Sequence, residues 1–166
     1  MLKVRKAELT DIDAVSEILL LAREYMHTHG NPTQWSGAYP DSQDVKEHIE
    51  KDEFYVGVDE NEKVKMCFAF CLGEEETYKK IQNGKWLNDQ EYGTIHMLAS
   101  DGKTGGCFAT CLEFCLSKIK NIRADTHKDN KKMNECLLKN GFEYCGIIYV
   151  RDGTPRNAYQ LMLKTQ

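Results

Sequence analysis

The chain has 166 residues, of which 41% are hydrophobic, and a formal net charge of −4 at pH 7. This length predicts one domain with a sizeable core, and the negative charge argues against non-specific nucleic-acid binding. The sequence contains no apolar run of about 18 residues, so no membrane span is expected, and its charged, strand-like start is not expected to act as a signal peptide. The seven cysteines lack paired Cys-x-x-Cys spacing, which indicates reduced thiols in a cytoplasmic protein and no metal site.

The order of predicted strands and helices indicates a mixed α/β fold. Alternating apolar residues mark strands, and apolar residues three or four apart mark helices. In chain order the predicted strands are residues 2–5, 54–58, 64–72, 92–100, 122–127, 142–150 and 158–164. The predicted helices are residues 10–26, 42–51, 107–116 and 130–140, and residues 73–90 form a polar excursion between strands. This order predicts a mixed central sheet with helices on both faces.

The N-terminal part of the sequence is expected to form a helix followed by a loop with two aromatic residues. Thr10, with Asp13 three residues later, resembles a capping box at the helix start. Residues 27–41 contain two glycines and two prolines and therefore form a loop. This loop also carries Trp35 and Tyr39. Aromatic loop residues either wall a binding site or hold the loop down by packing, and the sequence leaves both alternatives open.

A glycine-bearing turn between a strand and a helix is the most informative local feature. The turn Asp101–Gly106 reads DGKTGG and precedes the helix that begins at Cys107. Small residues there let backbone N–H groups approach an anion, and the helix N-terminus adds a partial positive charge. The turn is thus a candidate site for a phosphate or pyrophosphate, with an ordinary structural turn as the alternative.

Two signatures around this turn resemble those of the GNAT superfamily of acetyl-CoA-dependent N-acetyltransferases. Residues 103–108 read KTGGCF where that family carries Arg/Gln-x-x-Gly-x-Gly/Ala. Gly106 keeps the first glycine, whereas Phe108 replaces the second. Residues 130–142 read NKKMNECLLKNGF where the family carries Asn-x-x-Ala and then Leu-Tyr-Glu-Lys-x-Gly-Phe, with Leu137 in place of the tyrosine. The first strand and helix start are also similar to the family.

The resemblance implies a single GNAT-like acetyltransferase domain over residues 1–166. Its sheet would be mostly antiparallel with one splayed parallel pair, and the acetyl-pantetheine arm of acetyl-CoA would lie between the two strands of that pair. The implied cofactor-binding residues are Leu98, Ala99, Ser100, Lys103, Thr104, Gly105, Gly106, Cys107, Phe108 and Asn130. A valine at Gly106 is then expected to block the cofactor with little loss of fold, because the helix tolerates valine.

The sequence offers several candidates for the general base of such a transfer. A base must take a proton from the incoming ammonium group, and histidine titrates near neutral pH. His96, in the strand that would flank the thioester, is the predicted catalytic residue. A structural histidine is the competing interpretation. Glu91, Glu75 and a water chain are the alternative bases.

The general acid is a second open question. In the family a tyrosine often protonates the departing CoA thiolate, and here Leu137 occupies its position. Tyr149 is the predicted catalytic substitute, and Tyr144 on the same strand is its rival. Solvent protonation of the thiolate is the third alternative.

The resemblance implies an N-acetyltransferase that moves an acetyl group from acetyl-CoA to a primary amine of a small molecule, a protein N-terminus or a lysine. Trp35 and Tyr39 would bind the acceptor. The alternative is a catalytically weak GNAT-like domain that binds CoA for sensing or scaffolding. A different phosphate-binding α/β enzyme is disfavoured by the lack of P-loop and dinucleotide motifs. No nucleic acid, membrane or metal is expected, and a homodimer is left open.

Overall fold

The computed structural model describes residues 1–164. Its elements in chain order are β1 (Lys3–Lys6), η1 (Leu9–Asp11), α1 (Ile12–Thr28), α2 (Ser42–Glu50), β2 (Phe54–Val58), β3 (Val64–Leu72), η2 (Glu76–Tyr78), β4 (Gly93–Ser100), α3 (Cys107–Lys118), β5 (Asn121–Thr126), α4 (Lys131–Lys139), β6 (Glu143–Tyr149) and β7 (Pro155–Met162). Every predicted strand and helix is present, with small shifts at the ends.

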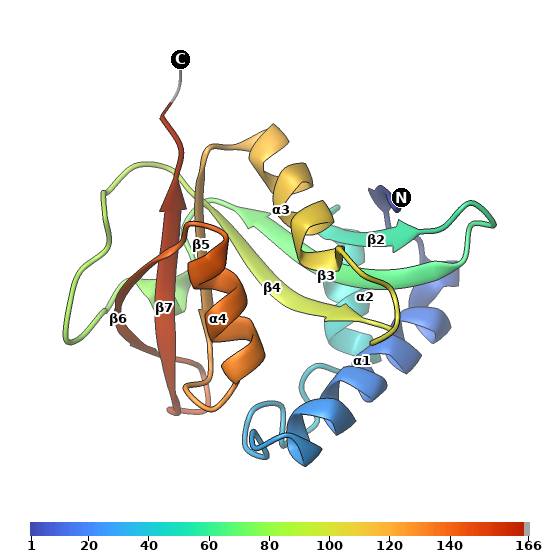
Figure 1. Ribbon diagram of the computed structural model, residues 1–166, viewed down its shortest axis with the longest axis horizontal. Helices are drawn as coiled ribbons and strands as arrows, with labels where there is room; N and C mark the ends of the chain where they lie inside the picture. The colour runs from blue at the N-terminus through green and yellow to red at the C-terminus, as the bar shows by residue number, and fades with distance from the viewer. Residues whose placement is uncertain (165–166) are drawn as a thin grey trace. The chain divides into compact units, whose positions relative to one another are not determined.

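The strands form one seven-stranded sheet in the order β1-β2-β3-β4-β5-β7-β6 (Figure 1). Pairing is antiparallel for β1 with β2, β2 with β3, β5 with β7 and β6 with β7. The pair β4 and β5 is parallel, and its register joins Gly93 to Ile122 and Thr94 to Arg123. The predicted mixed, mostly antiparallel sheet with one parallel pair is therefore confirmed.

Backbone contacts divide the chain into two compact units. The first unit comprises Met1–Phe70 and Ile95–Phe114, and the second comprises Cys71–Thr94 and the chain from Cys115 onward. Each unit has buried apolar side chains of its own. The single domain over residues 1–166 stays a prediction.

The helix start in the first unit differs from the expected one. Asp11, not Asp13, accepts a hydrogen bond from the backbone N–H of Glu8. Arg5 on β1 binds the same carboxylate at 2.8 Å, and its hydrogen bond lowers the pKa of Asp11. The predicted pair of Thr10 and Asp13 is wrong, because a contact from a strand selects Asp11 as the residue before α1.

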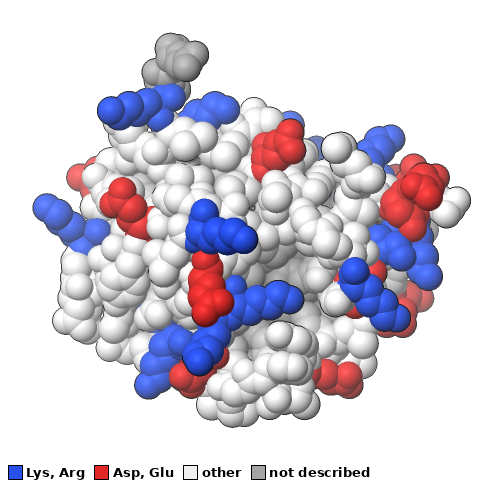
Figure 2. Space-filling view, in the orientation of Figure 1, with Lys and Arg blue, Asp and Glu red and all other residues white. Residues whose placement is uncertain are grey.

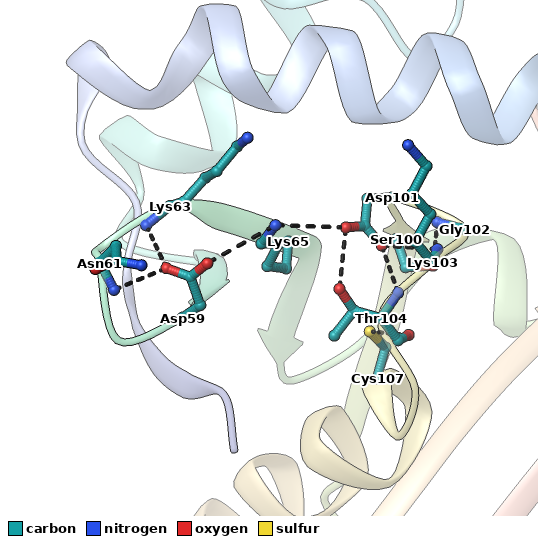
Figure 3. Close-up of polar contacts among 10 residues, drawn as sticks. All are labelled: Asp59, Asn61, Lys63, Lys65, Ser100, Asp101, Gly102, Lys103, Thr104 and Cys107. Atoms are coloured by element: carbon teal, nitrogen blue, oxygen red, sulfur yellow. Dashed lines mark hydrogen bonds and ion pairs between the residues drawn. The ribbon is translucent and has the colours of Figure 1, made fainter.

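The core of the first unit lies between its helices and strands. Figures 1 and 3 show α1 and α3 on opposite sides of the strands of this unit. The buried face of α1 consists of Val15, Ile18, Leu19 and Met26. On α3, Phe114 packs against Tyr55 of β2 with ring centroids 4.6 Å apart. The periodicity that predicted these elements therefore reflects real burial.

The second unit is centred on aromatic residues from the segment between β3 and β4. Tyr78 and Tyr92 are buried with Ile148 and Ala158, and Trp86 packs against this cluster. The segment was predicted as a polar excursion, but its aromatic residues anchor it to the core of this unit. In the same unit, Asn130 caps α4 by accepting from the backbone N–H of Met133 at 3.2 Å.

The surface mixes both signs of charge. Basic and acidic side chains are interspersed on the face that Figure 2 shows, as a net charge of −4 allows. None of the helices in residues 1–164 has the length and hydropathy of a membrane span.

Candidate functional site

The turn after β4 is organised by Asp101 (Figure 3). Its carboxylate accepts from the backbone N–H groups of Lys103 at 2.9 Å and Thr104 at 2.8 Å. The same carboxylate accepts from the Thr104 hydroxyl at 2.9 Å, and Ser100 Oγ accepts from the N–H of Gly102 at 3.2 Å. These bonds fix the first half of the turn and use two N–H groups that the sequence assigned to an anion.

The second half of the turn is open. Gly105 and Gly106 are exposed, and a Cβ added at either would meet no atom within 4 Å. Over residues 1–164, the backbone N–H groups of these two glycines have no acceptor from the protein. Both precede the first turn of α3, where a helix attracts anions. This half of the turn therefore fits a phosphate group.

The expected tolerance of valine at Gly106 is wrong. Gly106 has φ of +75°, a left-handed conformation that β-branched residues adopt only with strain. A substitution there would disturb the turn itself. Gly105 has no positive φ and the same open surroundings, so it is the better probe of an anion site.

A lysine lies between two carboxylates beside the turn. Lys65 Nζ is 3.9 Å from Asp101 Oδ2 and 3.7 Å from Asp59 Oδ2. Burial opposes ionisation of Asp101, but hydrogen bonds from Thr104 and Lys103 prevail and lower its pKa. Asp101 is thus ionised at neutral pH, and Lys65 offsets its charge next to the proposed anion site.

The start of α3 is packed through small and apolar side chains. Cys107 Sγ donates to the Thr104 carbonyl at 3.3 Å, and Phe108 is half-buried. Cys111 and Cys115 are fully buried on the same helix, and all seven cysteines are free. The cysteine repeat along α3 is therefore a packing feature.

The predicted residues on β4 alternate between two environments. His96, Leu98 and Ser100 are half-buried, whereas Ala99 is buried with its strand neighbours. Met97 has φ of +53°, so the strand departs from regular extended backbone beside His96. Such a departure is common at functional sites, where regular pairing is interrupted.

The loop between α1 and α2 is tied to α1. Arg23 donates to the carbonyls of Ala38 at 3.3 Å and Pro40 at 3.2 Å. Trp35 is half-buried with φ of +57°, and Tyr39 is 47% exposed. Of the two aromatic residues, Tyr39 presents the larger exposed surface to a ligand.

The remaining predicted residues lie in the second unit. Asn130 uses its side-chain oxygen to cap α4. Tyr149 is 45% exposed at the end of β6, and its hydroxyl lies 3.4 Å from Gln82 Oε1, to which it donates. Leu137, at the position of the family's tyrosine, is 1% exposed.

Sequence reasoning missed a polar cluster in the second unit. The guanidinium of Arg123 lies 4.2 Å from the centre of the Trp86 ring and 3.9 Å from that of Tyr92. Nearby, the Tyr78 hydroxyl donates to Asp125 at 2.6 Å. The signal in the sequence was the alternation of the polar residues Asn121, Arg123 and Asp125 along β5, which places them on one face.

No protein-family model and no curated protein matches the sequence. A GNAT-family acetyltransferase from Streptococcus agalactiae matches with a TM-score of 0.87 and 30% identity, over 99% of this chain and 96% of that chain. A GNAT-family acetyltransferase from Listeria monocytogenes matches with a TM-score of 0.72 and 18% identity, over 98% of this chain and 95% of that one. A chain of the NatC complex, solved with a Gag peptide and CoA, matches with a TM-score of 0.65 and 13% identity, over 98% of this chain and 99% of that chain.

Proposed function

This chain belongs to the GNAT family of acetyltransferases, and on that premise we propose that it moves the acetyl group of acetyl-CoA to a primary amine. The observation that carries the proposal is the open half-turn of Gly105 and Gly106 at the start of α3. Unpaired N–H groups, absent Cβ atoms and a helix N-terminus together suit a pyrophosphate. CoA supplies such a group, and its thioester supplies the activated acetyl.

Fewer backbone N–H groups are available to an anion than the sequence predicted. Because Asp101 already accepts from Lys103 and Thr104, we assign these two residues to shaping the turn. The pyrophosphate would bind N–H groups from Gly105 to Phe108. Lys103 in the turn adds a positive charge that favours an anion, whereas the charge of Lys65 is offset by Asp59 and Asp101.

The strand before the turn would bind the acetyl-pantetheine arm. Backbone groups from Leu98 to Ser100 would hydrogen-bond the arm, and an N–H among them would polarise the thioester carbonyl. A base first takes a proton from the ammonium group of the acceptor. The free amine nitrogen then attacks that carbonyl, and the C–S bond breaks as the nitrogen loses a second proton and the thiolate leaves. His96 on the same strand is the proposed base.

The thiolate that leaves needs a proton from elsewhere. Leu137 is buried and carries no exchangeable proton. Tyr149 is exposed and bears a hydroxyl, so it is the proposed acid, with solvent as its competitor. An exposed phenol is in rapid exchange with water, and the two routes give the same products.

The acceptor side is proposed at the loop that carries Trp35 and Tyr39. The NatC complex is bound to a peptide, and a protein N-terminus or lysine is one acceptor class that such a loop would admit. A small-molecule amine is the other. Both classes present a primary amine to the same chemistry.

A second candidate function is CoA binding without turnover, for sensing or scaffolding. It is favoured by Leu137 in place of the family's tyrosine, because that change removes the usual acid. Both candidates predict CoA binding at the turn, and only the first predicts transfer.

Cofactor binding is tested by unfolding the protein with and without acetyl-CoA. Acetyl-CoA at about 100 times its dissociation constant should add about 2.7 kcal/mol to the free energy of unfolding. Butyrate at the same ionic strength is the control, since it carries charge but no pyrophosphate. A thermal midpoint that saturating acetyl-CoA leaves unchanged contradicts both candidate functions.

A further inference from the structure

A single lysine on β3 lies between the carboxylates of two turns (Figure 3). Lys65 Nζ is 3.7 Å from Asp59 Oδ2, in the hairpin between β2 and β3, and 3.9 Å from Asp101 Oδ2, in the turn after β4. All three residues belong to the first unit. Their side chains are only 18–26% exposed, so salt screens these charges less than it screens charges on the open surface.

Both carboxylates are held in place by the backbone of their own turns. Asp59 Oδ1 accepts from the N–H groups of Asn61 at 2.9 Å and Lys63 at 3.0 Å, as Asp101 Oδ1 accepts from two N–H groups of its turn. In each aspartate the other oxygen, Oδ2, is the one nearest Lys65. Neither carboxylate can therefore turn away from the lysine without losing backbone hydrogen bonds.

The main chain also joins Lys65 to the turn after β4. The backbone N–H of Asp101 donates to the Lys65 carbonyl at 2.9 Å, so β3 helps to fix where the Asp101 carboxylate lies. Although burial opposes ionisation, hydrogen bonds from the turn lower the pKa of Asp101. A permanent negative charge thus stands at the beginning of the turn to which we assign the pyrophosphate.

This charge opposes the binding of an anion. The Asp101 carboxylate repels a pyrophosphate bound at Gly105 and Gly106 of the same turn, unless a cation offsets its charge. Within residues 1–164, no cation other than Lys65 forms an ion pair with Asp101. Lys65 carries one positive charge and faces two carboxylates, so the share that Asp59 takes leaves the charge of Asp101 only partly offset.

We propose that Lys65 is a positioning residue for the cofactor, because it offsets the charge of Asp101 and so lets the turn keep its carboxylate and still bind a pyrophosphate. Asp59 limits this effect by competing for the same lysine. The inference rests on the proposed function and deepens it. It names a residue outside the turn that sets the affinity for CoA by acting through Asp101.

Lys65→Met is the first variant, because methionine keeps an unbranched side chain and removes the charge. CoA affinity, measured by calorimetric titration of the full chain, should fall by at least about fivefold, the scale of one partly exposed charge interaction. The loss should shrink at about 1 M salt, where the Debye length is about 3 Å. Pantetheine, which lacks the phosphates, should bind the variant and the wild type equally. Wild-type CoA affinity in Lys65→Met, or an equal loss for pantetheine, overturns the proposal.

A second variant distinguishes positioning from direct contact with the phosphates. Asp101→Asn keeps a carbonyl oxygen for the backbone N–H groups of the turn and removes the charge. In that background Lys65→Met should change CoA affinity by less than about twofold, because no charge is left to offset. Lys65→Arg, which keeps the charge, should recover most of the affinity in the otherwise wild-type chain. A full loss in the Asp101→Asn background would show that Lys65 binds the cofactor itself and would overturn the inference.

The competition from Asp59 has a test that does not depend on the stability of Lys65→Met. Asp59→Asn should raise CoA affinity by about two- to fivefold, because Lys65 is then left to Asp101 alone. Glu60→Gln removes an exposed carboxylate of the same hairpin and should leave the affinity unchanged. Thermal melts report whether each variant is folded. Equal effects of Asp59→Asn and Glu60→Gln would contradict the sharing of Lys65 between two carboxylates.

Failure of this inference and failure of the proposed function give different results. A protein that transfers acetyl groups and binds CoA with equal affinity in all these variants overturns the inference alone. A protein that shows the expected affinities and never transfers the acetyl group overturns the transferase function and leaves the role of Lys65 standing. A wild-type chain that does not bind CoA overturns both.

Discussion

His96 is the residue on which the proposed proton transfer depends. It is half-buried on β4, beside a residue with positive φ. His96→Ala should lower turnover by ~10²–10⁴-fold if the imidazole is the base. The loss should shrink at high pH, where more of the amine arrives deprotonated. Turnover is measured against pH on the folded fraction, with acetyl-CoA affinity as a second readout that should change little.

His29→Ala is the matched control for this prediction. His29 is an exposed histidine of the same unit that stacks on Tyr25 with ring centroids 3.9 Å apart. It should leave turnover within a small factor of wild type. A His96→Ala protein that loses stability but keeps its turnover per folded molecule at every pH would show that the histidine is structural.

Substitutions of Leu137 and Leu138 test whether Leu137, at the position of the family's tyrosine, fills the core. Leu137 is 1% exposed and Leu138 is 54% exposed. Leu137→Tyr should lower the free energy of unfolding by about 1–3 kcal/mol, because extra atoms enter a filled core. Leu138→Tyr should change it by less than about 0.5 kcal/mol, as surface substitutions do. Urea unfolding measures both.

The outcome also bears on acid catalysis. If Leu137→Tyr is no less stable than wild type, the core has room for a phenol and our account of this position fails. A stable Leu137→Tyr protein with raised turnover would in addition show that proton delivery to the thiolate limits the wild-type enzyme.

At the scale of elements, the turn between β4 and α3 carries the cofactor proposal. Gly105→Val should weaken CoA binding by at least about tenfold, or about 1.4 kcal/mol, because its branched side chain would fill the space that a phosphate needs. The fold should be retained, since nothing lies within 4 Å of the new Cβ and the backbone there has no positive φ. Calorimetric titration with CoA measures the affinity.

Gly37→Val is the matched control for Gly105→Val. Gly37 lies in the loop between α1 and α2, also with no atom within 4 Å of an added Cβ and no positive φ. Its substitution should leave CoA affinity unchanged. Wild-type affinity in a folded Gly105→Val protein would place the pyrophosphate elsewhere.

The strands and helices themselves follow from patterns that are visible in the sequence. The short run 54–58 and the largely apolar run 64–72 predict β2 and β3 with the bounds that the structure has. The start of α1 was missed because Glu8 and Asp11 form the capping box, earlier in the chain than the predicted pair of Thr10 and Asp13. Arg5 also holds the Asp11 carboxylate from a strand. The anchoring of the segment before β4 was missed because its few aromatic residues stand among charged ones.

The candidate site was less predictable than the fold for the same reason. The glycines of the turn were visible in the sequence, but the direction of the Asp101 side chain was not. That side chain decides which N–H groups remain for an anion. Likewise, the bond between Tyr78 and Asp125 joins positions 47 residues apart in the chain, a distance over which spacing rules carry no information.

At the scale of the whole molecule, family membership and the identity of the acceptor depend on different features of the protein. Membership of the GNAT family rests on a likeness that spans 99% of the chain. The acceptor depends on loops and on a few polar side chains, which vary independently of the fold. A mixed-charge surface with a net charge of −4 gives no strong preference for an anionic partner.

The central claim is that the protein transfers acetyl groups, and one measurement tests it most directly. The protein is incubated with acetyl-CoA labelled in the acetyl group and a set of alkylamines, lysine peptides and peptides with free N-termini. We predict label in an amide product, with one CoA thiol released for each amide formed. Bound acetyl-CoA that stays intact, with no labelled amide from any of these amines, would contradict the account and favour a CoA sensor.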